Sequence, residues 1–129
     1  MGLFSRPDRP RAVQEAVTAL RDLEEVREEF ESAGRDFDSA LEQQDSIAFL
    51  FGFTTYYADK YKVKGSREIV DLAVEVFRSA FGDTTGIRMF GGLNETMRDR
   101  RPSSRFGYEA ARDGRGSGEM AAAYFRGML

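Results

Sequence analysis

The sequence has no cysteine and no histidine. A chain without cysteine forms no disulfide and offers no thiolate nucleophile, and the lack of histidine removes imidazole general bases and Cys/His zinc sites. Most enzyme mechanisms and structural metal centres depend on these side chains. We therefore expect a protein that is not an enzyme and that holds no cofactor and no metal ion.

Long hydrophobic runs are also missing. The longest apolar stretch, residues 47–58, is far shorter than the roughly 20 residues that span a bilayer, and the N-terminus shows no apolar leader. We expect a cytoplasmic protein without membrane insertion. A hydrophobic share of 41% is too high for a wholly disordered chain, and 129 residues fit one domain.

Apolar residues recur at alternating three- and four-residue steps over residues 10–43, with charged residues on the other faces. This spacing predicts one long amphipathic helix, unless Gly34 divides it. Such a helix is longer than a small domain, so we expect its apolar seam to contact a partner or a second copy. The large side chains of the seam are Leu20, Leu23, Phe30 and Phe37.

Three further apolar segments follow. Residues 47–57 are apolar on nearly every face; their aromatics and threonines are compatible with a strand, but their length and the capping residues around them favour a helix. Residues 66–81 have a clear helical period, and Ile87, Phe90, Leu93 and Met97 recur at helical spacing. We expect an all-α bundle of four to five helices. Its core would be built from the inner faces of residues 13–41, 47–61, 66–81 and 87–97.

The helical pattern weakens towards the C-terminus. Residues 102–118 are rich in arginine, glycine and serine, which predicts a flexible linker. Residues 119–129 predict a short apolar docking helix, and the sequence leaves open whether it docks on its own domain or on another chain. An N-terminal arm, residues 1–9, and a helical domain, residues 10–101, precede these two segments. The docking side chains would be Tyr124, Phe125, Met128 and Leu129.

Charge is spread unevenly. Residues 13–46 contain eleven acidic residues against three arginines, whereas residues 98–115 contain six arginines. Arginines with aromatic neighbours suit phosphate groups and stacked bases, although the net charge of −3 makes nucleic acid the less favoured partner. The candidate anion contacts are Arg98, Arg100, Arg101 and Arg105.

These patterns together predict a non-enzymatic helical protein–protein interaction module. We expect a structural, adaptor or chaperone-like role, with self-association into a homo-oligomer. Two alternatives remain: a nucleic-acid-binding protein that uses residues 98–115, and a binder of a small apolar ligand in an aromatic-lined pocket between helices.

Overall fold

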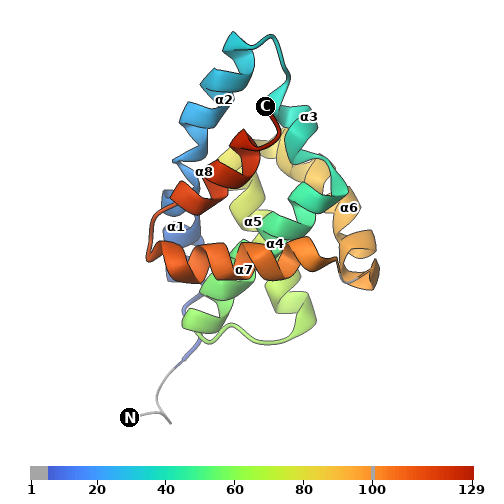
Figure 1. Ribbon diagram of the computed structural model, residues 1–129. Coiled ribbons are helices and arrows are strands. Elements are labelled where there is room, and N and C mark those ends of the chain that lie inside the picture. The colour runs from blue at the N-terminus through green and yellow to red at the C-terminus, as the bar shows by residue number, and fades with distance from the viewer. Residues whose placement is uncertain (1–5, 100) are drawn as a thin grey trace.

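The computed structural model describes residues 6–99 and 101–129, which form helices joined by turns, with no strand in these two ranges. The all-α class expected from the sequence is confirmed, and the helices outnumber the four to five predicted. Figure 1 shows them gathered around α4, which contacts α1, α3, α5, α6 and α7. In chain order the helices are α1 (Arg9–Leu20), α2 (Leu23–Ser32), α3 (Phe37–Leu41), α4 (Gln44–Lys60), α5 (Ser66–Phe81), α6 (Asp83–Asp99), α7 (Pro102–Gly114) and α8 (Glu119–Arg126).

The central position of α4 follows from its composition. A helix that is apolar on nearly every face must be covered on every face, and other helices cover α4 from several sides. Its polar threonines are satisfied within the helix, because the hydroxyls of Thr54 and Thr55 donate to the carbonyl oxygens of Leu50 and Phe51. The choice between helix and strand for this segment is thereby settled in favour of a helix.

The long helix expected at the N-terminus is divided into α1, α2 and α3. Gly34, with φ +70°, ends α2, as a left-handed glycine commonly does. At the turn between α1 and α2, Gly118 lies so close that a Cβ there would be 2.0 Å from the carbonyl oxygen of Ala19. The N–H of Gly118 donates to the Asp22 carboxylate over 2.9 Å. The division lets the apolar seam follow the core of its own domain instead of extending beyond it.

Residues 102–118 differ from the flexible linker expected, because most of them form α7. This helix packs along α4 through glycine rather than through large apolar side chains (Figure 1). A Cβ at Gly107 would lie 1.8 Å from the carbonyl oxygen of Phe49, and Gly52 of α4 meets the α7 backbone in the same way. Contact between two backbones needs few large apolar residues, which explains why the segment has the composition of a linker.

Side-chain contacts fix the direction of α7 relative to α4. Arg101, just before α7, lies 3.0 Å from the carboxylate of Asp45 in the first turn of α4. Further along, the Tyr108 hydroxyl donates to Asp59 in the last turn of α4 over 2.8 Å. This hydrogen bond raises the pKa of Tyr108. The two helices therefore run in the same direction.

The short helix α8 closes an aromatic core. The ring of Phe125 is buried, with its centroid 5.5 Å from Phe37 and 6.2 Å from Phe49 in edge-to-face geometry. Tyr124 stacks on Phe49 with the ring centroids 4.0 Å apart. Such aromatic pairs add roughly 0.5–1.5 kcal/mol each to the free energy of unfolding beyond simple burial. The C-terminal helix thus docks on its own domain, one of the alternatives that the sequence left open.

Candidate functional site

Most of the side chains expected to contact a partner lie in the core of this chain. Because the seam follows the core after the division of the N-terminal helix, its large residues are covered by their own domain and are not available at the surface. The buried members of the set are Leu20, Leu23, Phe30, Phe37 and Phe125. Tyr124 and Met128 are half-buried and Leu129 is exposed, so a partner contact through the C-terminal residues stays a prediction.

Exposed apolar surface is found on α6 instead. Ile87, Phe90 and Met97 are 58%, 44% and 37% exposed, whereas Met89 and Leu93 are fully buried. The expectation that the first three side chains belong to the core is wrong. Helix α6 carries apolar residues on two faces, and the face of Met89 and Leu93 is the one that packs on the domain.

The outward face of α6 has a regular spacing. Ile87, Phe90, Asn94 and Met97 follow one another at steps of three, four and three residues, and we call these four residues the α6 stripe. At about 100° per residue they fall within an arc of roughly 80°. All four are exposed, and Figure 1 shows α6 at one edge of the molecule. The α6 stripe is therefore open to solvent along three turns of helix.

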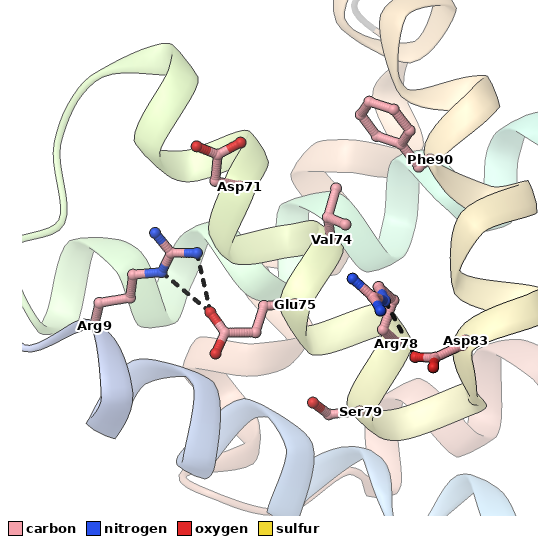
Figure 2. A pocket seen from close by; sticks show the side chains of 8 residues that line it. All are labelled: Arg9, Asp71, Val74, Glu75, Arg78, Ser79, Asp83 and Phe90. Atoms are coloured by element: carbon pink, nitrogen blue, oxygen red, sulfur yellow. Dashed lines mark hydrogen bonds and ion pairs between the residues drawn. The ribbon is translucent and has the colours of Figure 1, made fainter.

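A groove of about 670 Å³ opens beside the α6 stripe, between α5, α6 and the start of α1 (Figure 2). Val74 of α5 and Phe90 of α6 give it apolar side chains, and charged residues make up most of the remaining lining. The exposed ring of Phe90 thus belongs both to this groove and to the α6 stripe. The groove extends the apolar surface from α6 towards α5.

Ion pairs border the same groove and hold its helices in place. Nη2 of Arg9 lies 3.0 Å from Oε2 of Glu75, which ties the first turn of α1 to α5. Nε of Arg78 lies 3.1 Å from Oδ1 of Asp83, which ties the end of α5 to the start of α6. Both pairs are drawn as dashed lines in Figure 2. Exposed pairs of this kind contribute about 0–1 kcal/mol each, so they orient the helices more than they stabilise them.

A second groove, of about 450 Å³, lies between α4, the end of α6 and α7. Met97 of the α6 stripe lines it together with Phe51, Tyr108, Arg101 and Arg105. The structure therefore brings together two of the four arginines that the sequence singled out. Arg98 is exposed in the last turn of α6, and Arg100 lies outside the described residues.

Acidic partners accompany both arginines of this groove. Arg101 pairs with Asp45 at 3.0 Å, and Nε of Arg105 lies 3.1 Å from Oε1 of Glu109 one turn away on α7. An anion that bound here would compete with these carboxylates. The groove offers hydrogen-bond donors and aromatic surface, with little excess positive charge.

The acidic residues of α2 form ion pairs with a basic residue of α8. Arg126 of α8 lies 2.7 Å from Glu29 and 3.6 Å from Glu25, both on the acidic face of α2. In the turn after α2, the guanidinium of Arg35 donates to the carbonyl oxygens of Met128 and Leu129. The acidic face thus holds the C-terminal helix of the same chain.

A polar cluster joins α1 to the end of α4. The Tyr61 hydroxyl and Lys60 both donate to the carboxylate of Glu15, and Arg11 lies 3.6 Å from it. Burial opposes ionisation of Glu15, but the hydrogen bonds from Tyr61 and Lys60 outweigh this effect and lower its pKa. The groups are all engaged with one another, which fits a structural clamp between two helices.

The described part of the chain meets the requirements of neither a metal site nor a membrane span. In residues 6–99 and 101–129, acidic side chains form no group of three that could hold a metal ion. In the same ranges, no helix combines the length and the apolar character needed to cross a bilayer. Comparison of the chain with protein-family models, with curated proteins and with solved structures finds no match.

Proposed function

We propose that this chain is a non-enzymatic protein–protein interaction module that binds through the outer face of α6. The observation that carries the proposal is the exposure of Ile87, Phe90 and Met97 on one helix whose opposite face is fully packed. Contiguous apolar surface on a folded domain marks a binding surface more often than isolated apolar residues do. Structural, adaptor and chaperone-like roles all use such a surface.

The surroundings of the α6 stripe support this proposal. The stripe is continued at Phe90 by the groove towards α5 and at Met97 by the groove towards α4 and α7. Aromatic and methionine side chains are enriched where proteins bind one another, and charged residues form the rim. Here the ion pairs of Arg9 and Arg78 lie at the border of the groove that Phe90 lines.

Site-specific photo-crosslinking tests the proposal. A benzophenone side chain at position 90 should capture a protein in cells that express the chain, because Phe90 lies at the centre of the α6 stripe. The control carries the same group at position 31, an exposed residue of the acidic helix α2. Equal capture at both positions, or none at position 90, would refute binding through α6.

The second groove favours one further candidate, an anionic ligand such as a nucleic acid. Arg101, Arg105 and Tyr108 share that groove, so donors and a stacking surface lie together. The test is a mobility shift with single-stranded oligonucleotides at about 50 mM salt, where phosphate contacts are strongest. Arg105→Ala should weaken such a complex, and the absence of any shift at this salt concentration would dispose of the candidate.

A further inference from the structure

The partner of the α6 stripe follows from the order of its residues, and this step rests on the proposed function. The spacing of three, four and three residues is the same in both directions along the chain. When a second α6 lies antiparallel across the first, Ile87 faces Met97 of the other copy and Phe90 faces its Asn94. We infer that the α6 stripe pairs with the α6 stripe of a second copy of this chain, in an antiparallel arrangement about a two-fold axis.

Charge at the two ends of α6 agrees with this direction. Asp83, which also pairs with Arg78 of its own chain, stands in the first turn and Arg98 in the last, and both lie within roughly 20° of the arc of the stripe at 100° per residue. In an antiparallel pair the acidic start of each helix lies within about one turn of the basic end of the other. A parallel pair would instead place Asp83 beside Asp83 and Arg98 beside Arg98. The helix dipoles also oppose one another favourably only in the antiparallel pair.

Gly91 supplies an independent observation. A glycine inside a helix destabilises it relative to alanine, so a packing reason is usually found. Gly52, Gly86, Gly92 and Gly107 each have such a reason, since a Cβ at any of them would lie 2.8 Å or less from another atom of this chain. At Gly91 a Cβ would meet nothing within 4 Å. At 100° per residue Gly91 lies about 40° outside the arc of the α6 stripe, on the flank beside Ile87, and close to the midpoint of the stripe along the helix axis, so a second α6 would pass along this flank.

A self-complementary face explains these three features together. Exposed apolar residues alone would suit many partners, but a palindromic spacing with opposite charges at its ends suits an identical helix in reverse. Gly91 then leaves open space on one flank of the contact, which side chains of the second copy can occupy. The stripe is short, so the dimer is expected to be weak and to dissociate on dilution.

Light scattering on undiluted samples at several chain concentrations tests the pairing first. At about 100 µM chain the wild type should have the mass of a dimer, and Phe90→Glu should return the monomer with an unchanged helical circular dichroism spectrum. The matched control is Phe106→Glu, which makes the same change at an exposed phenylalanine of α7 and should leave the dimer intact. A monomeric wild type at this concentration would overturn the inference.

Gly91→Ala separates the interface from simple folding. Alanine should stabilise the isolated helix, while its methyl group should raise the dimer dissociation constant about fivefold by occupying the space on the flank that the second copy uses. Sedimentation at several concentrations measures the dissociation constant, and urea unfolding measures stability. An unchanged dissociation constant with higher stability would show that no second copy contacts this flank of α6.

Disulfide trapping tests the direction, because the natural sequence has no cysteine to interfere. In the antiparallel pair, Ile87→Cys mixed with Met97→Cys should give a disulfide between the two variants. Neither variant alone should crosslink, because a residue and its own copy are then about 15 Å apart along the axis at 1.5 Å per residue. Crosslinking of each variant with itself would establish a parallel pair and refute the arrangement.

These outcomes also separate the inference from the proposed function. If position 90 captures a different protein while the chain stays monomeric, the interaction surface stands and the second copy is excluded as its occupant. If position 90 captures nothing and the chain is monomeric, both fail.

Discussion

Tyr57 is fully buried in α4, and its hydroxyl has no hydrogen-bond partner among the described residues. Its ring packs against Phe53 and Tyr56, with centroids 5.7 and 5.1 Å away. An unpaired buried hydroxyl costs about 1–3 kcal/mol of desolvation, whereas the ring itself stabilises the core. Tyr57→Phe keeps the ring and removes the hydroxyl, so we expect it to raise the free energy of unfolding by about 1 kcal/mol near pH 7.

The same change should alter the response to alkaline pH. Burial raises the pKa of Tyr57 from 10.0 to about 12. Between these two pH values the unfolded chain has released the proton and the folded chain still holds it. The contribution of the neutral phenol to the free energy of unfolding is therefore complete below pH 10 and is lost as the pH rises towards 12. The loss amounts to at most about 2.7 kcal/mol, and Tyr57→Phe does not suffer it.

Urea unfolding followed by circular dichroism measures both effects. The advantage of Tyr57→Phe over the wild type should be about 1 kcal/mol near pH 7 and should grow by about 1 kcal/mol or more by pH 11. Because each tyrosine of the wild type other than Tyr57 is retained in the variant, their titration cancels in the comparison. A variant that is less stable than the wild type near pH 7, or a difference that does not change with pH, would refute the reasoning.

Three further changes address the contacts that hold the helices together. Gly107→Ala forces a Cβ towards a backbone carbonyl and should destabilise the chain in urea unfolding by at least about 1–3 kcal/mol, whereas Gly114→Ala, at an open position of the same helix, should stay within about 0.5 kcal/mol of the wild type. Phe125→Ala should cost about 3–5 kcal/mol in the same assay because it empties the aromatic core, and a loss no larger than that of the exposed control Met120→Ala would mean that α8 contributes little. Glu15→Gln should make the free energy of unfolding less dependent on pH under acidic conditions. The lowered pKa of Glu15 stabilises the wild type above pH 4.5, and this contribution disappears as the pH falls through the folded-state pKa. The same pH dependence in both proteins would contradict the role of Glu15 as a clamp between α1 and α4.

Hydrophobic periodicity located the helices that pack through large side chains. The segment expected at residues 66–81 forms α5, because its apolar stripe and the glycine that follows it, Gly82, both agree with a helix; the residue that precedes its first turn is Gly65, and no side chain caps it. The all-apolar segment around Phe49 became the central helix for the same reason. Such patterns report which side chains are buried, and here burial and sequence correspond closely.

Hydrophobic periodicity gave wrong predictions for a helix that packs through its backbone and for a helix that has apolar residues on two faces. Helix α7 packs through Gly107, which leaves no apolar signal, so its residues had the composition of a linker. For α6 the spacing predicted one inner face with Ile87, Phe90, Leu93 and Met97, but Leu93 is buried together with Met89 while the other three side chains are exposed. Which face of α6 is buried depends on how the helix packs against α4 and α5, which is a tertiary property.

The packing of α8 against the rest of the domain has a consequence for folding during synthesis. The hydrogen bond between Gly118 and Asp22 joins positions 96 residues apart, and the ring of Phe125 fills the space between Phe37 and Phe49. During synthesis on a ribosome, α1 to α6 therefore emerge before the two helices that seal them. Until α8 leaves the exit tunnel the aromatic centre is uncovered, so the nascent chain should remain sensitive to protease and bind chaperones until α8 has emerged.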